Sequence, residues 1–151
     1  MFSCCKKSTQ QVICTFEDDP VVVKTESIDD AVPYTDPPVD IDILMEDFGG
    51  DMDFIKDLLK KTVVELNKVL YDIEKGVGEG NFQSLLESSH SIKGVAAVMR
   101  CGFLHLKSLE LENYTIMYLK CPNSVSHDQF NTNVVDLRKQ IHLVEEYTGK
   151  L

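Results

Sequence analysis

Apolar residues recur at spacings of three and four positions through most of the chain after residue 39, and this period restricts what the chain can fold into. The clearest run is spaced four, three, four and three: Phe130, Val134, Leu137, Ile141 and Val144. Such spacing places one apolar stripe along a helix, whereas a half-buried strand would alternate by two. The segment from about 127 to 147 is therefore predicted to be a helix that packs on a core.

Three more segments have the helical period. The first helix is expected to start after Asp51 as N-cap and to end in "GVGEG", and its buried face is marked by Ile55, Leu59, Thr62, Leu66, Val69 and Ile73. The next runs from about Asn81 through "LLESSHSIKGVAAVMRCG", and another covers about 104 to 119, before "CPN" breaks the chain. A short apolar piece, "DIDILMEDF", precedes them all. The prediction is an all-α, up-and-down four-helix bundle with one short additional N-terminal helix.

The composition changes sharply near residue 39. The part before it holds four of the five prolines, includes "FEDDPVVVKTESIDDAVPYTDPPVD", and has no sustained helical period. We therefore divide the chain into an acidic, disordered arm over 1–38 and a four-helix bundle over 39–151. Within the arm, Val21–Val23 has strand character without a partner strand, and Cys4 and Cys5 beside two lysines are weak support for a lipid anchor.

Several function classes are excluded by composition. A net charge of −10 disfavours nucleic-acid binding, which needs a basic face, and no apolar run is long enough for membrane insertion. Five cysteines without a C-x-x-C pair indicate reduced thiols, and the histidines His105, His127 and His142 form no metal-ligand pattern. We expect a monomer that works on protein partners in the cytoplasm, with the nucleus as a second compartment.

The second long helix carries a histidine on its outer face. On a wheel of about 100° per residue, His90, Ala97 and Cys101 lie about 140–180° from Ile92, which is on the core side. Gly94 lies near 200° and Lys93 near 100°. His90 is therefore predicted to point to solvent among small side chains that leave it accessible to another protein.

This arrangement suits acceptance of a phosphoryl group. A neutral imidazole is a nucleophile at cellular pH, and the ammonium of Lys93 at i+3 can stabilise the charge that arrives. Gly94 at i+4 removes a Cβ from the path of the partner. Taken one at a time, the three residues could equally be a surface histidine, a solvated lysine and a tolerated glycine. Only their spacing favours a phosphoryl-accepting site.

The run His90-Ser91-Ile92-Lys93-Gly94 resembles the H-x-x-K-G motif of histidine-containing phosphotransfer (HPt) domains. The resemblance covers about residues 40–119 and includes "GGD", "GNF" and "LELEN". It implies that His90 is the phosphoacceptor, and that Glu112, about six helical turns later, hydrogen-bonds Nδ1 of the ring; Glu110 is the neighbouring alternative. A carboxylate there would select the tautomer whose Nε2 can attack.

The resemblance also implies the partners and the reaction, although it leaves the net direction of transfer open. The phosphoryl group would come from an aspartyl phosphate on the receiver domain of a hybrid histidine kinase and pass to the aspartate of a response regulator. The receiver domain would supply the Mg²⁺, so the chain needs no cofactor of its own. It is predicted to be a carrier and not an enzyme, since it has no nucleotide-binding loop for kinase activity.

One part of the motif departs from the family. Where HPt domains usually have a glycine and a small residue at the end of the histidine helix, this chain has Arg100-Cys101, and its glycine follows as Gly102. Ala97, Arg100 and Cys101 are the predicted docking residues, with Arg100 equally interpretable as merely solvated. The alternative function is a helical adaptor that binds receiver domains or other signalling proteins without being phosphorylated; an intact His, Lys, Gly and Glu set favours the carrier.

Overall fold

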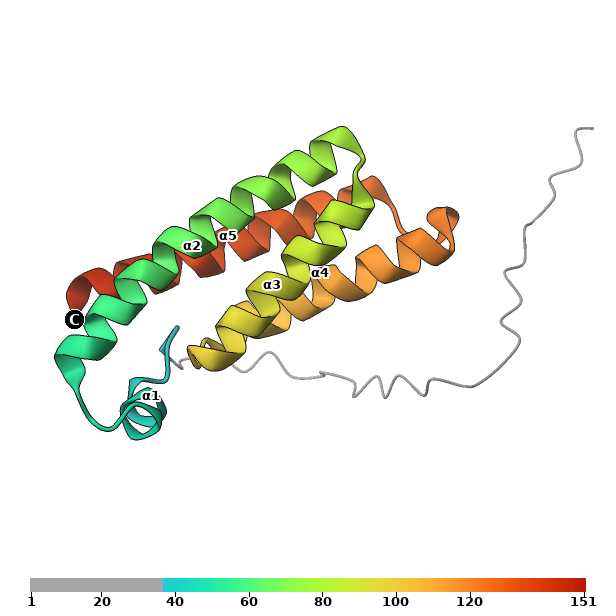
Figure 1. Ribbon diagram of the computed structural model, residues 1–151. Coiled ribbons are helices and arrows are strands. Elements are labelled where there is room, and N and C mark those ends of the chain that lie inside the picture. The colour runs from blue at the N-terminus through green and yellow to red at the C-terminus, as the bar shows by residue number, and fades with distance from the viewer. Residues whose placement is uncertain (1–36) are drawn as a thin grey trace, which may run out of the picture. The chain divides into compact units, whose positions relative to one another are not determined.

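The computed structural model describes residues 37–151, which form helices and no strand (Figure 1). The helices are α1 (Ile41–Asp47), α2 (Met52–Glu79), α3 (Phe82–Val98), α4 (Gly102–Lys120) and α5 (His127–Lys150), with a 3₁₀ turn, η1 (Pro122–Ser124), before α5. The all-α prediction is confirmed for this part of the chain. The predictions for the arm, including Val21–Val23 and Cys4-Cys5, lie outside the described residues.

The four long helices run alternately up and down, as Figure 1 shows. Helix α3 packs against α2 and α4, and α5 packs against the same two neighbours from the other side. Each long helix buries one face in the centre. The largest fully buried side chains are Leu44, Ile55, Leu59, Leu66, Ile73, Leu85, Ile92, Leu104, Leu111, Phe130, Leu137 and Ile141. Within residues 37–151, no helix is both long and apolar enough to cross a membrane.

Side-chain caps mark the starts of α2, α3 and α5, and the cap at Asp51 is the one predicted from the sequence. The side chain of Asp51 accepts a hydrogen bond from the Phe54 N–H at 3.0 Å, and that of Asn81 accepts one from the Ser84 N–H at 3.1 Å. Ser126 and Gln129 form a reciprocal capping box at the start of α5. These bonds satisfy backbone N–H groups that have no partner inside the helix, so they set where each helix begins.

The turn between α2 and α3 is tight because two glycines permit it. Gly80 ends α2 in a left-handed conformation with φ 69°, and its N–H reaches the carbonyls of Gly76 and Val77. Gly76 is buried, and a Cβ there would lie 3.3 Å from the carbonyl oxygen of Asn81. The two helices therefore pack antiparallel after a two-residue link, which places the start of α3 against the end of α2.

The corner between α3 and α4 differs from its prediction. Arg100 takes a left-handed φ of 55°; its N–H donates to the Ala97 carbonyl at 3.3 Å, and the Cys101 N–H donates to the Ala96 carbonyl at 2.9 Å. This is a Schellman end with arginine in the place that glycine usually takes. Helix α4 then starts at Gly102, two residues before the predicted start at 104.

The same corner corrects the placement of Cys101. The wheel put it on the outer face with His90, but the structure buries it completely. The wheel was wrong there because α3 ends at Val98, and the left-handed residue after it turns the chain inward, so the 100° step no longer applies.

The short helix α1 is attached to this corner. The Asp40 N–H donates to the carbonyl of Arg100 at 3.0 Å, and Nε of Arg100 donates to Oδ2 of Asp47 at 2.8 Å. Val39 and Leu44 are fully buried. The additional N-terminal helix is thus confirmed.

Candidate functional site

His90 stands on the outer surface of α3. Its side chain is 70 % exposed, whereas the adjacent Ser89 is buried and donates its hydroxyl to the carbonyl of Leu86 at 3.0 Å. Ile92, two positions on, is fully buried. The predicted direction of the imidazole is therefore confirmed: one face of α3 is held in the core, and His90 projects from the opposite side.

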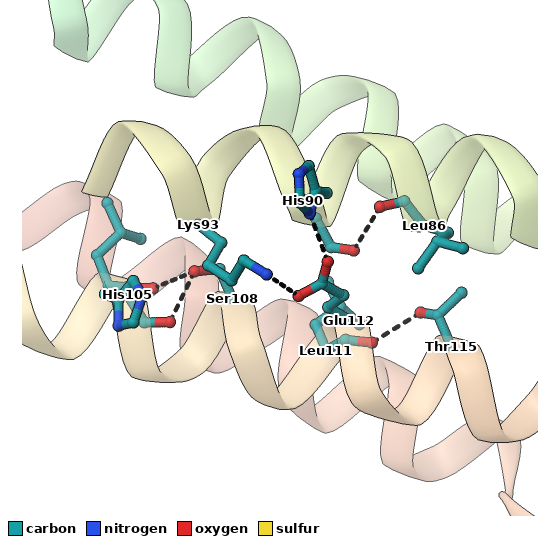
Figure 2. A network of polar contacts seen from close by, with 10 residues as sticks. Leu86, His90, Lys93, His105, Ser108, Leu111, Glu112 and Thr115 are labelled. Carbon is teal, nitrogen blue, oxygen red and sulfur yellow. Dashed lines mark hydrogen bonds and ion pairs between the residues drawn. The ribbon is translucent and has the colours of Figure 1, made fainter. Parts of the chain in front are cut away.

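Glu112 comes to this histidine from α4, where it belongs to a stripe that is otherwise inside the bundle. The buried residues of α4 are Leu104, Ser108, Leu111, Glu112 and Thr115. Ser108 and Thr115 each return their hydroxyl to a carbonyl of their own helix at 2.7 Å, so these small polar residues are satisfied without a partner across the bundle. The carboxylate of Glu112, in contrast, reaches out of α4 towards α3 (Figure 2).

The carboxylate bridges two residues of α3. Its Oε1 lies 2.6 Å from Nδ1 of His90, and its Oε2 accepts a hydrogen bond from Nζ of Lys93 at 2.5 Å (Figure 2). Glu110, the alternative partner considered from the sequence, instead accepts a hydrogen bond from Lys107 at 2.9 Å. The geometry thus selects Glu112 as the partner of the imidazole and adds Lys93 as a second partner of the same acid.

The charge on Glu112 determines which nitrogen of His90 carries the proton. Burial raises the pKa of this carboxyl, but the hydrogen bonds and charges of Lys93 and His90 outweigh it and hold the pKa below its ordinary value. The acid is therefore ionised at neutral pH, and an ionised carboxylate only accepts hydrogen bonds. Nδ1 must then donate, which leaves Nε2 with a free lone pair; among residues 37–151 nothing bonds to that atom.

Gly94 lies one turn beyond His90 and is exposed. A Cβ built on it would meet no heavy atom within 4 Å, and its φ is not in the left-handed region. Neither packing nor backbone conformation therefore requires glycine at this place. Together with the exposed Ala97, it leaves a low surface on α3 beside the imidazole.

The predicted docking residues separate into two groups. Ala97 and Arg100 are on the surface and line a hollow of about 550 Å³ whose other walls include residues of α1 and His105. Arg100 is 46 % exposed and paired with Asp47. Cys101 borders the same hollow but has no exposed surface, and burial raises the pKa of its thiol to about 12, so it offers a partner no reactive thiolate.

The contact between Lys93 and Glu112 was not foreseen from the sequence. The spacing of the buried residues on α4 could have indicated it. From Leu104 to Thr115 they follow one another by four, three, one and three positions, which places Glu112 on an inward face. A buried carboxylate needs a cation or several donors, and Lys93 is the cation within reach.

No metal site accompanies this arrangement in the described part of the chain, where no three His, Cys, Asp or Glu side chains gather closely enough to hold an ion. In comparisons with known proteins, no family model, no curated protein and no solved structure matches the chain. The site therefore has to be interpreted from its own geometry: an exposed imidazole whose tautomer is held by a buried, ionised acid.

Proposed function

We propose that this chain is a phosphohistidine carrier of a multistep phosphorelay. It would accept a phosphoryl group on His90 from an aspartyl phosphate of one receiver domain and pass it to the aspartate of a response regulator. The proposal rests on one observation: an exposed imidazole is held through Nδ1 by a buried acid, so that Nε2 faces outward with its lone pair free. The resemblance of residues 90–94 to the HPt motif agrees with this role.

The transfer needs no general base. The lone pair of Nε2 forms the bond to phosphorus while the bond between phosphorus and the aspartyl oxygen breaks, and that electron pair leaves with the carboxylate of the receiver. The ring becomes a phosphoimidazolium whose Nδ1–H is still held by Glu112. The reverse sequence delivers the group to the next aspartate and restores the neutral ring, so the proton on Nδ1 never has to move.

The partners follow from the chemistry of the proposed transfer. Receiver domains would supply the phosphoryl group, its acceptor and the Mg²⁺ that neutralises the moving charge, while this chain supplies the nucleophile and its orientation. Such a carrier would work as a monomer in the cytoplasm, with the nucleus as a second compartment for its response regulator. The alternative is an adaptor with the same bundle that binds receiver domains without becoming phosphorylated.

The test is transfer from a phosphorylated receiver domain in the presence of Mg²⁺, followed by separation of the two proteins. Phosphohistidine is lost in acid and survives alkali, whereas an aspartyl phosphate survives neither for long, so alkali-stable label on this chain reports the histidine. We expect label on the wild-type chain and none on His90→Gln, which should keep its helix content because the side chain is exposed.

His142→Gln is a matched control. His142 is also exposed, at 65 %, but it lies on α5 beside Glu145 and Glu146 and has no buried acid behind it. Label should persist in this variant. Binding of a receiver domain to the wild-type chain without any alkali-stable label would favour the adaptor and overturn the carrier.

A further inference from the structure

We infer that Lys93 acts through Glu112: its ammonium keeps this buried carboxylate ionised, and the carboxylate in turn keeps the proton on Nδ1 of His90. Lys93 would then be a positioning residue for the transfer, and direct stabilisation of the incoming phosphoryl group would not be its main task. The inference deepens the proposed function and rests on it for the transfer step. The ion pair between Lys93 and Glu112 is already present in the unphosphorylated protein, so it can be tested without any transfer.

The geometry of the three side chains supports this order of action. Each oxygen of Glu112 has one partner, with Nδ1 of His90 at 2.6 Å from Oε1 and Nζ of Lys93 at 2.5 Å from Oε2. Figure 2 shows the ammonium directed at the carboxylate. The side chain of Lys93 is only 25 % exposed, against 70 % for His90, so the cation is withdrawn from the surface that a partner would approach.

Glu112 depends on this cation because it is itself nearly inaccessible, with 9 % of its side chain exposed. Burial favours the neutral acid, and the charged or titratable groups that act against it are Lys93 and His90, both on α3. On its own helix Glu110 is paired with Lys107, and no group of α5 acts on the carboxylate. Lys93 is therefore the one permanent positive charge at this acid within residues 37–151.

The protonation of Glu112 decides whether His90 is a nucleophile. A neutral carboxylic acid would donate to Nδ1, and the ring proton would then sit on Nε2, which removes the lone pair that attacks phosphorus. In the phosphorylated state the same ionised carboxylate holds the Nδ1–H of the phosphoimidazolium, which is the form with the better leaving group. Loss of the cation should impair both directions of transfer through the same atom.

The first experiment needs no phosphorylation. In protein labelled with ¹³C and ¹⁵N, NMR follows the titration of the Glu112 carboxyl carbon and the tautomer of the His90 ring. Lys93→Met, which keeps the length of the side chain, should move the Glu112 midpoint to higher pH and increase the Nε2–H tautomer. Lys93→Arg should restore both signals because it returns the charge. Wild-type titration and tautomer in Lys93→Met would overturn the inference.

The second experiment is a double-mutant cycle on the transfer rate from a phosphorylated receiver domain. Glu112→Gln keeps an oxygen that accepts from Nδ1–H but cannot be ionised or protonated. We expect Lys93→Met to slow transfer about tenfold in the wild-type background and less than about twofold in the Glu112→Gln background, because residues that act as a unit are not additive. Equal factors in both backgrounds would mean that Lys93 acts directly on the phosphoryl group.

The two experiments separate the two proposals. If the wild-type chain accepts no phosphoryl group, the carrier function fails, and the NMR titration still decides whether Lys93 controls Glu112. If transfer occurs but the Glu112 titration and the His90 tautomer do not change in Lys93→Met, the carrier function is supported and the inference about Lys93 is wrong. Helix content by circular dichroism is measured for every variant, and should Lys93→Met unfold, a Lys93→Arg chain that titrates unlike the wild type contradicts the inference.

Discussion

Replacing Gly94 with alanine separates stability from function at the site. Gly94 lies in the interior of α3, where glycine is less favourable than alanine by about 0.8–1.0 kcal/mol because it loses more backbone freedom on folding. The added Cβ meets no heavy atom within 4 Å, so no clash offsets that gain. Gly94→Ala should therefore raise the free energy of unfolding by about 1 kcal/mol and the melting temperature by about 4 °C.

The same methyl group should impair transfer. It would stand one turn from His90 on the low surface that a receiver domain has to approach, and interfaces that pack like protein interiors lose about 1–3 kcal/mol to an extra carbon without room. Transfer from a phosphorylated receiver domain should then fall about five- to a hundredfold, while urea unfolding shows the more stable protein. A stabilised variant with less activity is a result that general damage to the fold does not produce.

Gly149→Ala is the matched control, since Gly149 is also helical and open, but lies in the last turn of α5. It should gain stability, by less because helix ends fray, and transfer at the wild-type rate. Wild-type transfer by Gly94→Ala would refute the view that this glycine clears the way for a partner. A lower free energy of unfolding in Gly94→Ala would contradict the observation that a Cβ at this position meets no other atom.

Three further predictions concern the surroundings of the site. Because the pKa of Glu112 is lowered in the folded protein, its ionised form stabilises the fold above the unfolded pKa of about 4.3, and this stabilisation is lost as pH falls through the folded pKa. In urea unfolding, the wild type should therefore lose more stability than Glu112→Gln between about pH 5 and pH 3. Equal losses would contradict the ion pair. Arg100→Gly should melt above Arg100→Ala, since only glycine relieves the left-handed φ of 55°; the reverse order would show that no strain resides there. Ile92→Ala should lower the free energy of unfolding by about 2–4 kcal/mol in urea, because Ile92 is fully buried behind His90, and a loss below about 1 kcal/mol would contradict the packing of α3.

The sequence by itself determined the helices and the side of α3 on which His90 stands. A helix repeats every 3.6 residues, so the spacing of apolar positions shows which side chains turn inward without knowledge of any partner helix. The caps at Asp51 and Asn81 are equally local, because each side chain bonds a backbone N–H three residues ahead. These features follow from interactions within a few residues and lie close to where the sequence placed them, although α4 begins at Gly102, two residues before its predicted start.

The conformation of the corner after α3 could not be predicted from local sequence. The position of Cys101 depends on the left-handed conformation of Arg100, and that residue is held by α1 through Asp40 and Asp47, which lie more than fifty positions earlier in the chain. No helical period passes through such a residue. The inward turn of Cys101 is therefore a consequence of tertiary contacts and not of the spacing within α3.

Only the tertiary structure decided which acid serves His90. The resemblance favoured Glu112, with Glu110 as the neighbouring alternative, and no partner was predicted for Lys93. The packing of α3 against α4 brings Glu112 to both residues and leaves Glu110 with Lys107. The contact joins positions 22 residues apart, and its register depends on how two helices slide and rotate against each other. Side chains packed across the whole interface set that register, so the periodicity of neither helix alone contains it.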